Sequence, residues 1–158
     1  MKKIASLSII EDLKNNKVLM IKHLRGINAG YFNFPGGKKE EEETIEDCVR
    51  RETLEETGLT ILNPEKVGYV EFPSADYYVH IFKSTEFEGD IKAKKDEVEV
   101  FWQNLDKIPY DKMRKTDKDF LTDIFAGKYV QKRYVFDEDS KLINIVNLNT
   151  TEIEKKSR

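Results

Sequence analysis

Hydrophobic residues gather in short runs along the chain, and polar or glycine-rich stretches separate these runs. Runs rich in β-branched and aromatic residues predict strands at residues 4–10, 18–23, 66–72, 77–87 and 98–102. Two more runs, 129–136 and 142–148, lie on either side of an acidic turn and predict a hairpin. Helical spacing of the hydrophobic residues predicts two helices, 44–58 and 111–126. Strands combined with two separate helices favour a layered α/β (α+β) fold.

The stretches between these runs predict turns and one unusual loop. Residues 11–17 contain an Asn-Asn pair and predict a turn. Residues 25–37 hold four of the eight glycines in the chain, which indicates a backbone shaped for a function. The sequence shows no internal repeat and no linker between domains. We therefore expect one domain over residues 1–149, followed by a polar tail at 150–158.

Composition narrows the classes of function. The 158 residues carry a net charge of −3, which argues against a nucleic-acid partner held by bulk positive charge. A small phosphorylated ligand at a local site remains compatible with this charge. Cys48 is the only cysteine, so no internal disulfide can form and a reducing compartment is favoured. No hydrophobic run approaches the ~20 residues that span a bilayer, so we expect a cytoplasmic protein without a membrane partner.

The first predicted helix carries hydrophobic and acidic residues on one face. Spacings of three and four residues align six side chains there: Ile45, Cys48, Val49, Glu52, Glu55 and Glu56. The hydrophobic half predicts packing against the protein body, so the acids continue along a partly buried face. Three carboxylates near the negative end of the helix dipole repel one another, and a magnesium or manganese ion would compensate them. The alternative is a solvated helix whose acids pair with Arg50 and Arg51.

A set of residues at fixed spacing runs from the glycine-rich loop to just beyond this helix: Gly37, Glu43, Arg51, Glu52, Glu55, Glu56, Gly58 and Leu59. This set resembles the Nudix box, the signature of the Nudix hydrolases, and fills eight of its nine specified positions. The exception is Thr53, where the family usually has an aliphatic residue. Because Thr53 lies off the acidic stripe, we expect the change to affect packing rather than metal binding.

The resemblance implies a mixed β-sheet sandwiched between helices and a magnesium-dependent hydrolysis of a nucleoside diphosphate linked to another group, with manganese as a possible substitute. It implies metal ligands at one backbone carbonyl and four carboxylates: Gly36, Glu52, Glu55, Glu56 and Glu97. Arg51 would orient the glutamates, including Glu52, and Glu43 would support the joint between loop and helix. Glu56 is the first candidate for the base that takes the proton of the attacking water, with Glu97 as the alternative.

Stretches outside the box resemble the branch of the family that hydrolyses oxidised purine nucleoside triphosphates such as 8-oxo-dGTP. The resemblance implies that Asn33 binds the purine edge and that Lys38 lies near phosphate. Thr116 and Asp117 occupy the positions of two acids that read the other edge of the base. The remaining substrate-binding positions are expected at Ser6, His23 and Gly37. The implied reaction releases the monophosphate and pyrophosphate, and thereby clears damaged nucleotides from the pool.

Departures from that branch leave the substrate open. Arg114 stands where the branch has a tryptophan that stacks on the base, and Thr116 replaces one acid. Arg114 could stack its guanidinium instead. Lysine is common at the position of His23. The alternatives are hydrolysis of RNA 5′-triphosphates, ADP-ribose or sugar nucleotides, and a non-catalytic ligand sensor, although such sensors generally lose the box carboxylates that this chain keeps.

Ordinary structural roles are the alternative for several of these residues. Asn33 can form a turn, Asp117 can be a solvated acid, and Glu97 can be an exposed acid at the start of a strand. His23 can be a plain strand residue, and Cys48 is expected to be an inert core residue. A monomer or a homodimer is expected.

Overall fold

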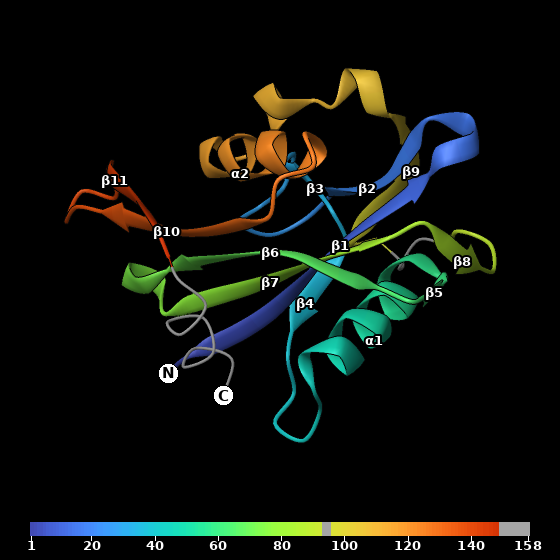
Figure 1. The fold of residues 1–158 in the computed structure, drawn as a ribbon, viewed down its shortest axis with the longest axis horizontal. Helices are drawn as coiled ribbons and strands as arrows, with labels where there is room; N and C mark the ends of the chain where they lie inside the picture. Colours follow the sequence, from blue (N-terminus) through green and yellow to red (C-terminus); the bar gives the residue numbers. More distant parts are fainter. Residues whose placement is uncertain (93–95, 149–158) are drawn as a thin grey trace.

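The computed structural model describes residues 1–92 and 96–148, which form a large mixed sheet with one helix on each face (Figure 1). The helices are α1 (Ile45–Thr57) and α2 (Lys115–Phe125). The strands of the large sheet are β1 (Lys3–Asp12), β2 (Lys17–His23), β3 (Phe32–Asn33), β4 (Gly36–Lys38), β6 (Glu65–Phe72), β7 (Tyr77–Ser84), β9 (Val98–Asn104), β10 (Val130–Phe136) and β11 (Leu142–Asn147). A second, two-stranded sheet consists of β5 (Thr60–Leu62) and β8 (Glu86–Glu88).

The large sheet combines parallel and antiparallel pairs. Its strand order is β11-β10-β6-β7-β1-β2-β3, with β4 paired to β1 and β9 paired to β2. β1 runs parallel to β7, and β10 runs parallel to β6, whereas the other pairs are antiparallel. Figure 1 shows α2 on one side of this sheet and α1 on the other. The predicted mixed sheet between helices is therefore confirmed.

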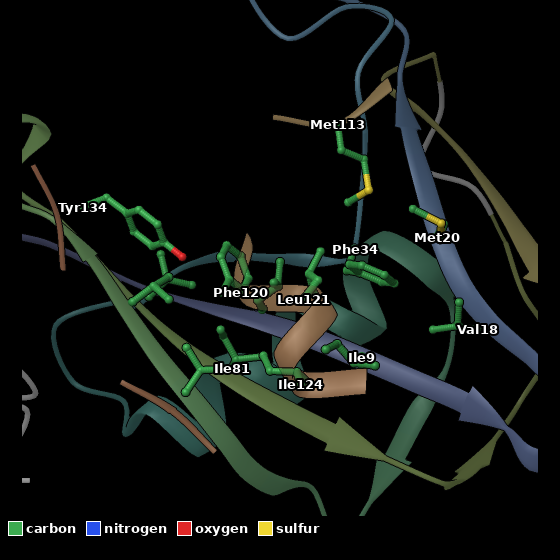
Figure 2. Close-up of a cluster of buried hydrophobic side chains, with 14 residues drawn as sticks. Ile9, Val18, Met20, Phe34, Ile81, Met113, Phe120, Leu121, Ile124 and Tyr134 are labelled. Carbon is green, nitrogen blue, oxygen red and sulfur yellow. The ribbon is translucent and has the colours of Figure 1, made fainter. Parts of the chain in front are cut away.

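The two helices cover separate hydrophobic clusters because side chains alternate between the faces of each strand. On β1, Leu7 and Ile9 belong to the cluster that contains the α2 side chains, whereas Ile10 belongs to the cluster that contains Val49 of α1. Figure 2 shows the first cluster, in which Phe120 and other α2 residues lie against the sheet. Burying each large side chain of this kind contributes ~1.5–3 kcal/mol, so these clusters fix both helices on the sheet.

The strand β1 has two partners along one edge, and this places the glycine-rich loop on the sheet. Its first half pairs with β4 and its last residues pair with β2. The register sets Gly37 opposite Ser6 and Gly36 opposite Leu7. The glycine pair is therefore held by main-chain hydrogen bonds beside α1 rather than left in a free loop.

The predicted loop at 25–37 and the predicted start of the second helix are wrong. The loop contains β3 and β4, which have only two and three residues; β3 pairs with the preceding strand β2, and β4 pairs with the more distant β1. No local pattern marks such short strands. The second helix begins at Lys115 rather than at residue 111, because Tyr110–Lys112 forms a 3-10 turn and Met113 has an extended backbone. Met113 is still buried in the core, as its hydrophobic character predicts.

Other differences concern the ends of strands. The run at 77–87 is divided into β7 and β8, and β5 was not predicted. The turn predicted at 11–17 is shorter, because β1 extends to Asp12 and β2 begins at Lys17. The expected polar tail at 150–158 lies outside the described residues. In the part of the chain that the structure describes, neither helix is long and apolar enough to cross a bilayer.

Candidate active site

The helix α1 begins and ends where the sequence predicts, and this fixes the direction of its acidic residues. Thr44 Oγ1 accepts a hydrogen bond from the Asp47 N–H at 3.0 Å, and Asp47 Oδ2 accepts one from the Thr44 N–H at 3.3 Å. This reciprocal cap satisfies two main-chain donors at the start of the helix. Gly58, at φ 83°, ends the helix in the left-handed conformation that glycine adopts without strain.

The glutamates on the acidic face of α1 are buried to different extents. Cys48 and Val49 are buried, as predicted, but the glutamate side chains are exposed to different extents: 18% for Glu52 and 54% for Glu55. The buried face instead continues through Thr53 and Thr57. The prediction of a partly buried acidic stripe therefore holds for Glu52 and fails for Glu55, because the packed face turns around the helix towards the threonines.

Arg51 connects the acids of this region. Its guanidinium binds both carboxylate oxygens of Glu43, at 2.7 and 3.0 Å. It also donates to Glu52 Oε1 at 2.9 Å, to Glu55 Oε2 at 3.2 Å and to the Lys38 carbonyl at 3.1 Å. These hydrogen bonds from Arg51 lower the pKa of Glu43 to about 2, and the bond to Glu43 raises the pKa of Arg51. A single cation thus contacts three carboxylates and holds that of Glu43 in the charged form.

The Gly36–Gly37 backbone approaches the glutamates closely. The Gly36 N–H donates to Glu56 Oε1 at 2.8 Å. A β-carbon added at Gly37 would collide with the carboxylate of Glu52, and one at Gly36 would collide with the Ser6 carbonyl. Glycine is therefore required at Gly36, where the clash is with fixed main chain, whereas a side chain at Gly37 would force the Glu52 carboxylate to move.

The oxygen atoms in this region are the kind of ligand that a hard divalent cation prefers. Carboxylates of Glu52 and Glu56 lie beside the main chain of Gly36 and Gly37, and all of these groups offer oxygen atoms. Within residues 1–92 and 96–148, however, no three acidic, histidine or cysteine side chains are grouped closely enough to hold a metal ion. Glu52 and Glu56 instead direct oxygens at Arg51 and at the Gly36 N–H. Binding of a metal would redirect these oxygens.

A cleft of about 870 Å³ opens beside the glycine pair. Eight of the predicted site residues line it: Ser6, His23, Asn33, Gly36, Gly37, Glu56, Thr116 and Asp117. Lys38, Arg51, Glu52, Glu55 and Glu97 are not among its lining residues. The side chains of Lys38 and Glu97 are exposed, and Glu97 precedes β9 and accepts a main-chain bond from Leu24. Their expected roles stay predictions.

The predicted base-reading residues meet at one end of this cleft. Asn33 is half-buried on β3, and its side-chain oxygen accepts a hydrogen bond from the Phe34 N–H at 2.8 Å, which fixes the amide. Asp117 is half-buried in the first turn of α2, and burial raises the pKa of its carboxyl to about 6, against the lowering effect of Arg114. Burial and the charge of Arg114 lower the pKa of His23. The raised pKa keeps Asp117 partly protonated near pH 6, and the lowered pKa of His23 favours its neutral form.

Other predicted residues have clear structural contacts. The Ser6 hydroxyl is buried and lies 3.4 Å from Cys48 Sγ, which also lies 3.4 Å from the Gly37 carbonyl. Burial raises the pKa of the Cys48 thiol to about 11, so this thiol stays protonated and unreactive, in agreement with the expected core role.

Several cleft residues were not identified from the sequence. The aromatic walls include Tyr31, Phe72 and Tyr77, and burial raises the pKa of Tyr77. The tip of the β10–β11 hairpin also reaches the cleft with Glu138 and Ser140. These residues come from distant segments of the chain, and no spacing pattern connects them. Only the acidic turn at 137–140 offered a local signal, which predicted a hairpin and not a site.

Comparison with known proteins shows the family of this chain. Residues 1–124, well over half of the chain, match the NUDIX domain family. The chain belongs to the Nudix family. The Nudix fold is also found in a MutT protein from Bacillus halodurans, which superposes with a TM-score of 0.76 at 24% identity over 91% of this chain and 96% of that one.

Two animal enzymes are among the proteins that are similar in sequence to this chain. The oxidized purine nucleoside triphosphate hydrolase of Danio rerio is 38% identical over 111 residues, which cover 68% of this chain and 70% of the relative. Its counterpart from Mus musculus is 38% identical over 102 residues, 62% of this chain and 65% of the relative. An ADP-ribose pyrophosphatase of Methanocaldococcus jannaschii is 37% identical over 68% of both chains. By family and by these enzymatic relatives the chain is a Nudix hydrolase, a class that generally uses a divalent metal and acts on nucleotides.

Proposed function

We propose that this Nudix hydrolase cleaves oxidised purine nucleoside triphosphates, such as 8-oxo-dGTP, to the monophosphate and pyrophosphate. The observation that carries the proposal is the single cleft that joins the Glu56–Gly36 end to Asn33 and Asp117. Phosphate chemistry and base reading would then take place in one cavity. The names of the zebrafish and mouse relatives support the same substrate class.

At the acid end, the residues of this chain would bind phosphate and move one proton. Water adds its oxygen to phosphorus, the P–O bond to the leaving pyrophosphate breaks, and the proton of the water passes to a carboxylate. Glu56 is the proposed acceptor because it lines the cleft, whereas Glu97 does not. Arg51 would hold Glu52 and Glu55 in place from behind the cleft. Magnesium, or manganese in its place, would be held by Glu52, Glu55, Glu56 and the Gly36 carbonyl, and would supply charge neutralisation and water activation.

At the base end, Asn33 and Asp117 would recognise the purine. An amide offers both a donor and an acceptor, and a carboxyl with a pKa of about 6 does the same near pH 6. Thr116 is almost fully buried in the first turn of α2, so its contribution is more restricted than that of an acid. His23, Gly37 and Ser6 complete the proposed wall of the cleft, and Lys38 would attract the phosphates from outside it.

The decisive experiment measures pyrophosphate release with magnesium. The value of kcat/KM for 8-oxo-dGTP and 2-oxo-dATP is compared with that for the four normal deoxynucleoside triphosphates, because discrimination depends on this ratio. The proposal expects a preference of at least tenfold for an oxidised purine. Even, weak turnover of all six would overturn the substrate assignment, and absence of turnover on a broad nucleotide panel would favour the ligand sensor.

ADP-ribose is the second candidate substrate. The archaeal relative of that name is as similar over as much of this chain as the animal relatives are. The cleft also extends to the hairpin residues Glu138 and Ser140, which could donate and accept hydrogen bonds to a ribose. Release of AMP from ADP-ribose, with no activity on oxidised triphosphates, would select this candidate, whereas release of pyrophosphate from RNA 5′-triphosphates would select an RNA substrate.

Cellular location and assembly are part of the same proposal. The one cysteine, Cys48, is buried as a free thiol, which suits a reducing cytoplasm. We expect a monomer or a homodimer, and light scattering of the purified protein distinguishes them.

A further inference from the structure

The loop between β2 and β3, residues 24–31, forms one wall of the cleft, and its Leu24 N–H is bonded to the Glu97 carbonyl where the loop begins. Asn28 and Tyr31 line the cleft, whereas Ile27 is 93% exposed. Short main-chain bonds hold the loop internally, including Gly30 N–H to His23 carbonyl at 2.8 Å and Tyr31 N–H to Asn28 carbonyl at 2.9 Å. These bonds define the shape of the loop but do not fix its distance from the opposite wall.

Arg114 supplies the contact across the cleft. Its Nη2 donates to Asn28 Oδ1 at 2.6 Å, and its guanidinium lies over the Tyr31 ring, 4.6 Å from the ring centre. Arg114 directly precedes α2, and 86 residues separate it from Asn28 in the sequence. A charged hydrogen bond and a cation–π contact from one side chain therefore join the loop to the start of the helix.

The same residue is tied to the base-reading acid. The Arg114 main-chain N–H donates to Asp117 Oδ2 at 3.1 Å. The position of the Asn28–Tyr31 wall and the position of the Asp117 carboxylate are thus set by a single residue. Only a planar guanidinium stacks on a ring and donates in its own plane at the same time, whereas a lysine ammonium cannot do both.

We propose that Arg114 is a positioning residue that determines base specificity by fixing the spacing between the 24–31 loop and Asp117. This inference rests on the proposed function. On this proposal, the base end binds a flat aromatic ligand between Tyr31 on the loop and the side chains of α2. Arg114 contacts the wall of the site and acts through Asn28 and Tyr31.

The test compares Arg114→Ala, Arg114→Lys and Asn28→Ala with a matched control, Lys115→Ala. Lys115 is the adjacent basic residue, and it does not line the cleft. For the preferred purine triphosphate, we expect KM to rise about five- to twentyfold in Arg114→Ala, with kcat within a factor of two of the wild type. Arg114→Lys should not restore KM. The double variant Asn28→Ala/Arg114→Ala should lose less than the product of the single losses, because both changes break one contact.

A second readout does not depend on turnover. Hydrogen exchange of the amides of residues 29–31 should accelerate in Arg114→Ala, Arg114→Lys and Asn28→Ala, and stay at the wild-type rate in Lys115→Ala. Unchanged exchange in the Arg114 variants, or a loss of kcat with KM unchanged, would overturn the inference. If the wild type hydrolyses no nucleotide but exchange accelerates as expected, the proposed function fails while the contact between loop and helix stands.

Discussion

The two ends of the cleft are built in different ways. The acid end comes from one continuous segment, residues 36–58, in which a helix and a glycine turn bring the charges together around Arg51. The base end is assembled from six separate parts of the chain: the 24–31 loop, β3, β6, β7, the start of α2 and the β10–β11 hairpin. A continuous segment leaves a signature in the sequence, whereas an assembled wall does not.

The electrostatics of the two ends also differ. At the acid end an ion pair lowers the pKa of Glu43 to about 2. At the base end burial raises the pKa of Asp117 to about 6. The first environment stabilises the charged carboxylate and the second stabilises the neutral acid. The acid end therefore suits the binding of cations, and the base end suits neutral hydrogen bonding to a heterocycle.

The largest effect is expected from Glu56→Gln at the acid end. Removing the proposed proton acceptor should lower kcat on the order of 10²–10⁴-fold, because a positioned base contributes that much. The amide still accepts from the Gly36 N–H, so the melting temperature should stay close to that of the wild type. Pyrophosphate release checks the rate, with Glu42→Gln as a control in the exposed charge run. Intact activity in Glu56→Gln would move the proposed base to Glu97.

Arg51→Ala should weaken both activity and stability. It leaves the Glu43 side chain, only 13% exposed, without its cation and frees Glu52 and Glu55 to repel each other. We expect a loss of about 2–3 kcal/mol in the free energy of unfolding, measured in urea, because a partly buried carboxylate that has lost its cation is destabilising. Arg50→Ala is the control, because Arg50 is 43% exposed and, among the residues that the structure describes, bonds to the Ile61 carbonyl and weakly to Glu46. Equal losses in the two variants would contradict the central role of Arg51.

The same pair predicts a dependence of stability on acid. Because the pKa of Glu43 is lower in the folded protein than its usual 4.5, its contribution is present above about pH 4.5 and lost as the pH falls towards 2. Urea unfolding between pH 2 and 5 should show this slope in the wild type and a shallower slope in Arg51→Ala. Identical slopes would show that the acid end does not stabilise the fold through this pair.

Asp117→Asn tests the base end. In the wild type, KM for the preferred purine should change near pH 6, because the Asp117 carboxyl titrates there. The side chain of the variant is neutral at every pH, so this change should disappear. Above pH 7, KM of the variant should differ roughly tenfold from that of the wild type, with kcat less affected. The sign for stability is opposite to that of Glu43. Because the folded pKa is raised, the wild type loses stability as the pH rises from about 4 to about 6, and Asp117→Asn should not. Kinetics between pH 5 and 8 and urea unfolding from about pH 4 to 7 measure the two effects. A KM profile shared with the wild type would remove Asp117 from base recognition.

The smallest effect is expected from Thr53→Val. Thr53 is fully buried, and its hydroxyl makes no hydrogen bond with any residue that the structure describes. Replacement by a side chain of the same shape should raise the free energy of unfolding by about 1 kcal/mol and leave kcat/KM unchanged. Thermal unfolding checks the gain, with the neighbouring exposed Leu54→Ala as a control. A loss of activity would show that the box position acts on the site and not on packing alone.

The sequence by itself determined the acid end and most of the fold. The caps of α1 and the β10–β11 hairpin follow from local residue patterns, because side chains at helical or alternating spacing share a face. The mixed sheet was implied by the resemblance to the Nudix family. The glycine pair was recognisable from the clustering of glycines in residues 25–37 and from the resemblance to the Nudix box. The structure supplies a reason for Gly36, where a β-carbon would overlap the Ser6 carbonyl. The caps, the hairpin and the glycine pair each depend on residues close together in the sequence or on a single residue type such as glycine.

Only the tertiary structure decided how the base end is assembled, although the resemblance already pointed to Asn33, Thr116 and Asp117. The strands β3 and β4 exist because β2 and β1 offer main-chain partners from elsewhere in the chain. The contact between Arg114 and the 24–31 loop, and the rise in the pKa of Asp117, depend on which segments pack beside them. Burial and contacts between distant residues are properties of the assembled sheet and helices, and no local spacing encodes them.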